Sequence, residues 1–220
     1  MAATCNNKPA DIVTLLLEGA NMEGRSSGGY TPLVFAARLG HAEVVKLLLD
    51  RGANIDAATD VGDTALLLAS KWGHADICRQ VADLLLDRGA SLTVRNRAGF
   101  GPLLAAVSEE HAPVVEALLK HGADANAVTC NGASALCMAA QKGYQDIARL
   151  LLQGGADPSL RDFSGKTPLE MARICRRAPV AAMLEQHAAA ATKGVGALPG
   201  TDPETVPEKN GSEMQLDQPL

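Results

Sequence analysis

Three histidines recur at similar spacing in this chain, at His41, His74 and His111. An imidazole can bind a metal ion or act as a general acid or base. Tyr144 and Arg177, however, fill the same place in later copies of a repeated sequence unit. We therefore interpret the histidines as loop residues between two helices, and not as metal ligands or catalytic bases.

The other groups that could carry chemistry also lack a suitable arrangement. Glu43, Asp76 and Asp146 recur near the expected start of a second helix, where a carboxylate complements the helix dipole. The chain contains no GxxxxGKS/T, GxGxxG, HExxH or GxSxG motif. The cysteines show neither CxxC spacing nor a nearby histidine pair: Cys5, Cys78, Cys130, Cys137 and Cys175. We predict no catalytic residue, no cofactor, no metal site and no enzymatic activity.

A five-residue phrase that begins with glycine and ends with leucine recurs at residues 29–33, 62–66, 99–103, 132–136 and 165–169. The steps between its copies are 33, 37, 33 and 33 residues. A Gly-Ala pair keeps the same steps, at residues 19–20, 52–53, 89–90, 122–123 and 155–156. Two independent signals with one period indicate a stacked repeat protein.

Each unit predicts two helices. In the first complete copy, Thr31 is a suitable N-cap, a first helix is expected over residues 33–39, and Gly40 can end it in the left-handed conformation. Apolar residues at helical spacing then predict a second helix that ends before Gly52. An alanine recurs in the first helix, which indicates close approach of neighbouring units there: Ala3, Ala36, Ala69, Ala106, Ala139 and Ala172.

The 37-residue step contains a four-residue insertion between His74 and Leu84. Four residues make slightly more than one helical turn, so we expect a longer second helix in which Ile77, Val81 and Leu85 share one face. We favour a tolerated change of length over a partner-specific ridge.

The stretch from Gly29 to Ala57 resembles an ankyrin repeat over its full length, and the resemblance extends through residues 1–187. It implies an all-α solenoid of stacked helix-turn-helix units with projecting hairpin-like loops, generally used to bind other proteins. The expected divisions are a partial repeat at 1–26, repeats at 27–59, 60–96 (with the insertion), 97–129 and 130–162, a C-terminal capping repeat at 163–187, and a disordered acidic tail with proline and glycine at 188–220.

The chain departs from the family pattern in places. The histidine that usually follows Thr-Pro-Leu is absent throughout, and Gly101 lacks the capping hydroxyl, which we expect to cost a few tenths of a kcal/mol. Arg173, Arg176 and Arg177 suit a polar closing surface at the last repeat. Met1 aligns inside a first helix, which leaves open a chain that begins further upstream.

In proteins that this chain resembles, contacts are usually made by the loop residues before Thr-Pro-Leu and by the residues that end the first helix. We nominate twelve residues at these positions for protein binding: Tyr30, Arg38, Leu39, Val61, Asp63, Lys71, Trp72, Arg97, Phe100, Glu109, Gln141 and Lys142. We expect Tyr30, Trp72 and Phe100 to lie along one concave surface that suits an extended peptide or a helix with apolar and acidic groups. Alternatively, each ring covers a neighbouring loop. For Tyr30 and Phe100 the two alternatives are balanced, and for Trp72 we favour contact.

Charge and composition limit the partners. The net charge of −5 disfavours nucleic acid, and the longest apolar runs are too short to cross a bilayer. The scattered cysteines favour a reducing compartment, so we expect a cytoplasmic or nuclear monomer. The sequence thus predicts a non-enzymatic adaptor or scaffold that binds another protein or peptide. The alternative is a fragment or targeting domain of a larger multidomain protein, such as a ligase subunit, kinase or acyltransferase, whose chemistry lies outside this chain.

Overall fold

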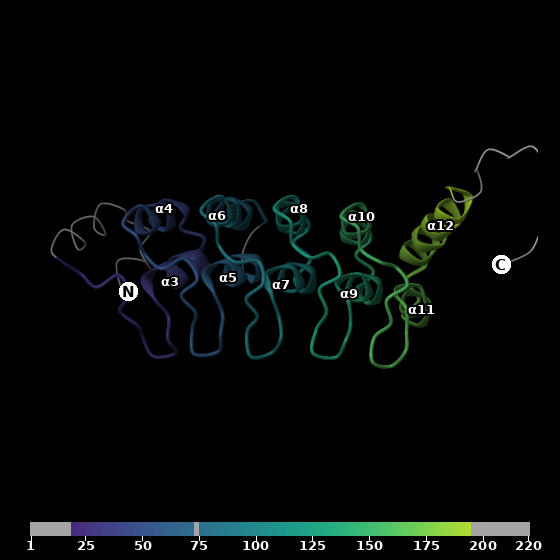
Figure 1. Ribbon diagram of the computed structural model, residues 1–220, viewed down its shortest axis with the longest axis horizontal. Coiled ribbons are helices and arrows are strands. Elements are labelled where there is room, and N and C mark those ends of the chain that lie inside the picture. Colours follow the sequence, from purple (N-terminus) through teal and green to yellow (C-terminus); the bar gives the residue numbers. More distant parts are fainter. Residues whose placement is uncertain (1–18, 73–74, 195–220) are drawn as a thin grey trace, which may run out of the picture.

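A computed structural model describes residues 19–72 and 75–194 as a row of helix pairs in two layers (Figure 1). The inner helices are α3 (Pro32–Leu39), α5 (Ala65–Lys71), α7 (Pro102–Ser108), α9 (Ala135–Lys142) and α11 (Pro168–Ile174). The outer helices are α4 (Ala42–Asp50), α6 (Ala75–Asp87), α8 (Ala112–Lys120), α10 (Gln145–Gln153) and α12 (Ala178–Gly194). The all-α solenoid expected from the sequence is confirmed.

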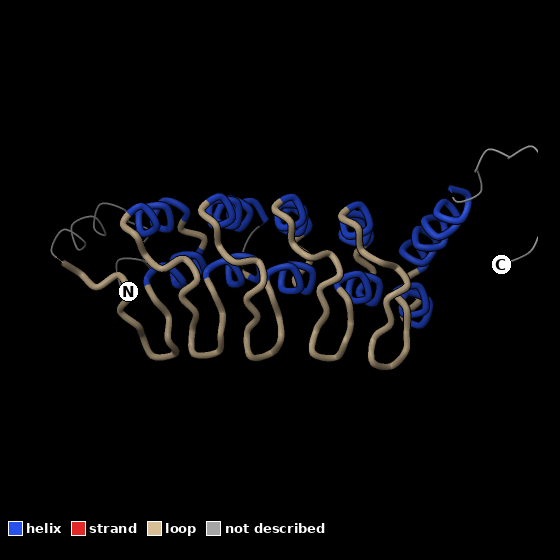
Figure 2. The backbone as a smooth tube through the Cα atoms, in the orientation of Figure 1, coloured by secondary structure: helices blue, strands red, loops and turns tan. Residues whose placement is uncertain are grey.

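The loops between helix pairs project on one side of the two layers, as Figure 2 shows. In the described part of the chain these loops contain isolated bridges, Ala58 with Thr64 and Val128 with Ser134, and no longer strand. Adjacent loops are joined by backbone hydrogen bonds, such as that from Arg97 N–H to the Val61 carbonyl oxygen at 2.9 Å. The loops therefore stack in register with the helices.

The inner helices begin at the caps that the sequence predicts. The hydroxyl of Thr31 accepts a hydrogen bond from the backbone N–H of Val34 at 3.3 Å, and Thr64, Ser134 and Thr167 cap their helices in the same way. Gly101 occupies the N-cap position of α7 without a side-chain bond. One of the five described inner helices thus lacks this stabilising contact, as expected.

The inner helices α3, α7, α9 and α11 are followed by a left-handed residue, and in two of these repeats that residue is not glycine. Gly40 has a φ of 75° and Gly143 a φ of 89°, whereas the equivalent Glu110 and Arg176 have φ values of 64° and 57°. A side chain disfavours this region of backbone space. Repeats four and six therefore contain local backbone strain that the glycine-bearing repeats avoid.

We expect Glu110→Gly to raise the free energy of unfolding by about 1 kcal/mol, because glycine adopts the left-handed conformation without strain. Equilibrium denaturation in urea measures the change. Glu109→Gly is the matched control, since Glu109 has a φ of −102° and gains nothing from glycine there. A destabilising effect of both substitutions would contradict the assignment of strain to Glu110.

The core lies between the two layers and between successive repeats. The recurrent alanines of the inner helices are fully buried in the described repeats: Ala36, Ala69, Ala106, Ala139 and Ala172. Helix α5 packs against both α3 and α7, so its buried side chains are enclosed by neighbours on each side. The positions at which the family usually has histidine hold buried apolar side chains in Val34, Leu67 and Leu104. Apolar packing thus replaces a polar link at these sites.

The insertion lengthens the second helix of its repeat. Helix α6 has 13 residues, whereas α4, α8 and α10 have nine each. Val81 and Leu85 are fully buried, which agrees with the shared face expected for them. Ile77 and His74 lie outside the residues whose side chains the structure describes. The added turn therefore keeps the buried stripe of the helix in contact with the core.

The C-terminal end corrects one predicted boundary. Helix α12 continues to Gly194, so residues 188–194 are helical and do not belong to a disordered tail. The change of composition near residue 188 marks the end of the repeat, but the run from Ala188 to Ala191 has high helix propensity and extends the helix. Most of the partial repeat at 1–26 and residues 195–220 of the tail lie outside the described residues.

Candidate protein-binding surface

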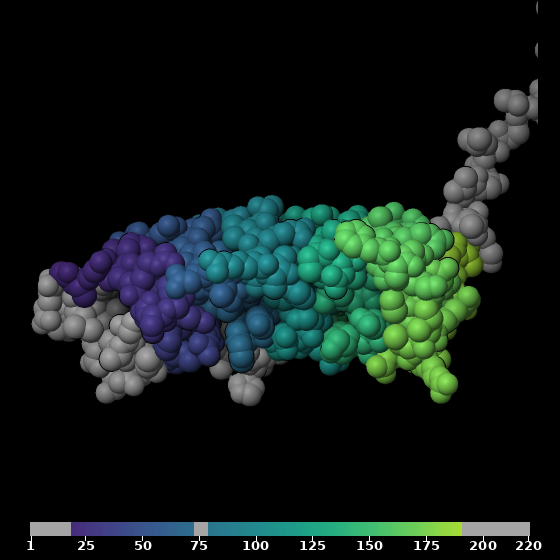
Figure 3. Space-filling model, turned by 90° about the horizontal axis from the view of Figure 1, so that it is seen from below, coloured from purple at the N-terminus to yellow at the C-terminus, as the bar shows by residue number. Residues whose placement is uncertain are grey.

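The nominated residues lie at the ends of the inner helices and on the loops beside them, and we call this face the inner surface. Figure 3 views the molecule from the side toward which the loops project in Figure 1. The colours follow one another along this side in sequence order, so neighbouring repeats contribute neighbouring strips of surface. A partner that lay along the stack would contact several repeats at once.

Trp72 is the most prominent aromatic residue among those nominated. It follows α5 directly, and 47% of its surface is exposed. Leu39 and Val61 are also exposed, at 42% and 49%. Tyr30 and Phe100 are only partly exposed and pack against the core. This packing leaves less of each ring for contact with a partner.

Cations surround the exposed indole. The guanidinium carbon of Arg38 lies 5.4 Å from the Trp72 ring centroid and 5.7 Å from that of Tyr30. The ammonium nitrogen of Lys71 lies 5.5 Å from the Trp72 ring centroid. These distances are within the range of cation–π attraction. We call Tyr30, Arg38, Lys71 and Trp72 the Trp72 cluster; it joins the ends of α3 and α5 across two repeats.

Asp63 was nominated for contact, but the structure places it in the interior. Its side chain is 9% exposed and accepts a hydrogen bond from Asn96 Nδ2 at 2.8 Å, and its backbone N–H donates to the Thr59 hydroxyl at 3.0 Å. The nomination of Asp63 as a surface contact was therefore wrong. A short side chain at this loop position turns toward the next loop and accepts a hydrogen bond from a partly buried amide instead of facing solvent.

Asn96 is a residue of the site that the sequence reasoning missed. Its Oδ1 accepts hydrogen bonds from the backbone N–H groups of Ala98 and Phe100, both at 3.0 Å, while its Nδ2 binds Asp63. Asn96 thereby fixes the loop that carries Phe100 and joins it to the preceding loop, which contains Asp63. The signal was present, because Thr59 and Thr129 occupy the equivalent place and also bond their own loops.

A pocket of about 210 Å³ opens beside the Trp72 cluster, between α5, α7 and the loop before α7. Lys71, Phe100 and Glu109 from the nominated set line it, together with Leu67, Asn96, Ala98, Ala105 and Ser108. Its walls are mainly apolar, with Lys71 and Glu109 as the charged groups. The Glu109 carboxylate accepts a hydrogen bond from the Ser108 hydroxyl at 3.2 Å.

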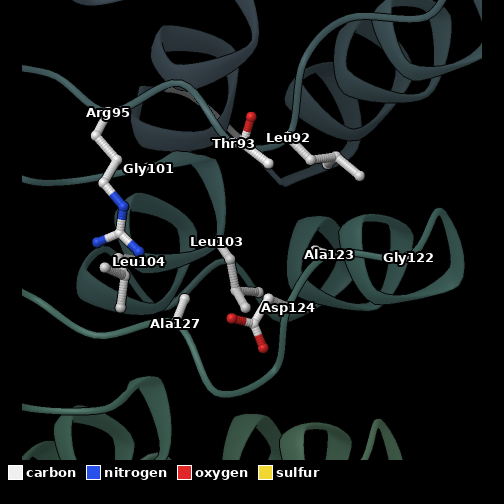
Figure 4. Close-up of a pocket in the computed structure, with 10 residues that line it drawn as sticks. All are labelled: Leu92, Thr93, Arg95, Gly101, Leu103, Leu104, Gly122, Ala123, Asp124 and Ala127. Carbon is white, nitrogen blue, oxygen red and sulfur yellow. The ribbon is translucent and has the colours of Figure 1, made fainter.

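A second pocket of about 200 Å³ lies between α7 and the loop that follows α8, and Figure 4 shows its lining. Its polar side chains are Thr93, Arg95 and Asp124. The guanidinium of Arg95 donates hydrogen bonds to the backbone carbonyls of Gly99 and Val128, so this cation already links two loops. None of the nominated residues lines this pocket, and its groups form no nucleophile and base pair.

The remaining nominated residues are spread along the inner surface. Arg97, Glu109, Gln141 and Lys142 are exposed. The Arg177 side chain donates to the backbone carbonyl of Gln141 at 3.1 Å. Two large apolar side chains outside the nominated set are more exposed than any within it, Phe163 at 82% and Ile174 at 60%. They occupy contact positions in the last repeat, where the sequence reasoning gave precedence to capping.

The structure supports the loop interpretation of the histidines. His41, His111 and Tyr144 are the residues immediately before the outer helices α4, α8 and α10, and their side chains do not cap those helices. Among the described residues, no group of three or more His, Cys, Asp or Glu side chains could hold a metal ion. A search of the same residues found no helix with the length and apolar content needed to cross a membrane.

The cysteines differ strongly in exposure, which predicts different reactivity. Cys137 is buried in α9, and burial, aided by the charge of Asp162, raises the pKa of its thiol to about 11. Cys130 is exposed on a loop. At about pH 8 only about one in a thousand Cys137 thiols would be ionised, so we expect iodoacetamide to alkylate Cys130 far faster. Raising the pH should increase labelling of Cys137, as mass spectrometry of the folded chain can show; equal rates at pH 8 would contradict this.

The comparison with protein families agrees with the geometry. The chain matches the family described as ankyrin repeats (3 copies) over residues 1–96, 79–162 and 103–193. Comparison with curated proteins gives no match. The chain belongs to the ankyrin repeat family, whose members are generally protein-protein interaction modules.

Proposed function

We propose that this chain is a non-enzymatic adaptor or scaffold that binds a partner protein through its inner surface. The observation that carries the proposal is the Trp72 cluster. A half-exposed tryptophan flanked by Arg38 and Lys71 projects from the end of an inner helix. Tryptophan and arginine are the residue types most enriched at binding hot spots. Membership of an interaction family alone favours no particular face, whereas the Trp72 cluster favours the inner surface.

The surface around the Trp72 cluster also supports the inner surface as the binding face. Leu39 and Val61 expose apolar side chains in the same two repeats as the cluster. Exposed apolar side chains beside an aromatic and cationic centre match the composition of protein interfaces. We propose that repeats two to four make the main contacts and that the chain acts as a monomer in the cytoplasm or nucleus. Light scattering on the purified chain and microscopy of a tagged chain check the last two points.

Affinity purification from the source cell tests the function. We expect Trp72→Ala to deplete a specific set of proteins that the wild-type chain retains. Phe163→Ala is the matched control, because Phe163 is more exposed but lies in the last repeat. If the same proteins bind equally to wild type and Trp72→Ala, the proposed surface is wrong. The Tyr30 and Phe100 rings are poorer targets, since both pack against the core and their truncation would also affect stability.

A further inference from the structure

The two cations of the Trp72 cluster have no acidic partner. Within the described part of the chain, the side chains of Arg38 and Lys71 form neither an ion pair nor a hydrogen bond, and the contacts that define their position are with aromatic rings. Several other cations in the described part of the chain are paired, for example Arg88 with Asp50 at 2.8 Å and Arg173 with Glu185 at 2.6 Å. The inner surface around Trp72 therefore presents two positive charges that form no ion pair with an acidic side chain of the described residues.

The described acidic groups of the neighbouring loops and helix ends form no ion pair with Arg38 or Lys71, and each of them has another partner. Asp60 pairs with Arg25 at 3.3 Å, and Asp63 accepts a hydrogen bond from Asn96 at 2.8 Å. Glu109 lies at the end of α7, one repeat further along, and its carboxylate is bonded to Ser108. The positive charge is thus concentrated at the ends of α3 and α5, with a negative group on the α7 side.

The aromatic rings also fix where the cations lie. Arg38 is near both Tyr30 and Trp72, and Lys71 is near Trp72. A cation held against a ring keeps its N–H groups available to an anion and loses less side-chain entropy when the anion binds. Arginine and lysine in this state favour a carboxylate through charge-assisted hydrogen bonds.

The pocket beside Lys71 suits a single apolar side chain. Its volume of about 210 Å³ is below the roughly 300 to 1,000 Å³ of typical small-molecule sites. Leu67, Phe100 and Ala105 give it apolar walls, and Lys71 belongs to both the pocket and the Trp72 cluster. A ligand that filled the pocket would hold its neighbouring atoms close to the cations.

We infer that the inner surface binds an extended segment of a partner protein in which an aspartate or glutamate adjoins a large apolar residue. The apolar side chain enters the pocket between α5 and α7, and the carboxylate meets Arg38 and Lys71. The inference rests on the proposed function and specifies the chemistry of the partner. In this arrangement the acidic residue of the segment lies nearer to α3 than the apolar residue does. The reverse order would bring its carboxylate close to the carboxylate of Glu109, which lies on the α7 side of the pocket.

Selection from a displayed library of random peptides against the full chain tests this inference. We expect the retained peptides to be enriched in Asp or Glu next to Leu, Ile, Met or Phe. The strongest of them, synthesised with a fluorescent label, should bind an Arg38→Gln, Lys71→Gln double variant about tenfold or more weakly than wild type. Its affinity for wild type should fall as salt rises from roughly 50 to 500 mM, and the double variant should lose most of this dependence.

Lys46→Gln is the control, because Lys46 is an exposed cation on the outer helix α4 and does not belong to the inner surface. It should leave affinity for the same peptide within about twofold of wild type. The melting temperatures of all variants confirm folding, and none of the replaced side chains is buried. Replacing the acidic residue of the peptide with its amide should give the same loss as the double variant.

The outcomes separate this inference from the proposed function. Selected peptides without acidic enrichment, but with binding that depends on Trp72, would overturn the inference and leave the surface intact. Peptides that bind Trp72→Ala as well as wild type would overturn both. Failure to select any peptide with the wild-type chain counts against the inference, since an extended segment should bind outside its parent protein.

Discussion

Leu66→Ala is expected to lower the free energy of unfolding by about 2 to 5 kcal/mol. Leu66 is in α5 and has no exposed surface. Helix α5 packs against α3, α6 and α7, so the truncated side chain would leave a cavity at a place where three helices meet. The loss therefore combines the transfer free energy of the missing methyl groups with the cost of an unfilled volume.

Urea denaturation followed by circular dichroism measures this effect, and Leu39→Ala is the matched control. The control makes the same chemical change at a leucine that is 42% exposed, so we expect it to cost less than about 1 kcal/mol. In a stack whose repeats contact only their neighbours, the loss at α5 should also separate the unfolding of repeats two and three from that of later repeats. Equal losses for the two variants would show that α5 does not lie in a closely packed layer.

The stacking itself could be predicted from the sequence, because it depends on features that repeat. The alanine at each first helix predicted close approach, and every described member of that column is fully buried. Thr31 and Gly40 predicted both ends of the first inner helix. When every repeat needs the same close packing or the same helix cap, the same residue type recurs at the same spacing. One sequence then contains several independent observations of that structural requirement.

The features that could not be predicted are specific to one repeat. Glu110 adopts the left-handed conformation because its repeat has the same turn between helices as the repeats with Gly40 and Gly143. A glutamate at this position does not by itself predict a positive φ. Asp63 turns inward because Asn96 of the next loop donates a hydrogen bond to it, and no property of Asp63 alone indicates that partner. Individual side-chain choices of this kind depend on what the neighbouring repeat presents.

The candidate binding surface could be predicted in part, because some of its features repeat and others are specific to one repeat. The positions of the contact residues follow from the repeat, and Arg38, Lys71 and Trp72 were all nominated from those positions. The pocket at Lys71 depends on how Leu67, Phe100 and Ala105 pack together, which the spacing does not specify. The partial burial of Tyr30 and Phe100 also follows from packing, and it leaves Trp72 as the principal exposed ring among the nominated residues.

Trp72→Ala is expected to weaken binding of a physiological partner by about 2 to 4 kcal/mol, or roughly 30-fold to 1,000-fold in Kd. The substitution removes the ring that a partner would cover, and it also removes the surface against which Arg38 and Lys71 are held. Both cations would then lose orientation as well as an aromatic neighbour. Isothermal titration calorimetry with a partner recovered by affinity purification measures the change.

Two further variants separate the contact of the ring from its support of the cations. Trp72→Phe retains an aromatic face, so we expect it to lose less than half of the binding free energy that Trp72→Ala loses. Phe163→Ala removes a more exposed ring from the last repeat and should change Kd by less than about threefold if the partner lies on repeats two to four.

Because Trp72 is 47% exposed, its truncation should cost no more than about 2 kcal/mol of stability, and circular dichroism checks that the variant remains folded. A larger effect of Phe163→Ala than of Trp72→Ala would move the binding surface to the C-terminal end of the stack, where Phe163 and Ile174 expose the apolar area that a partner needs.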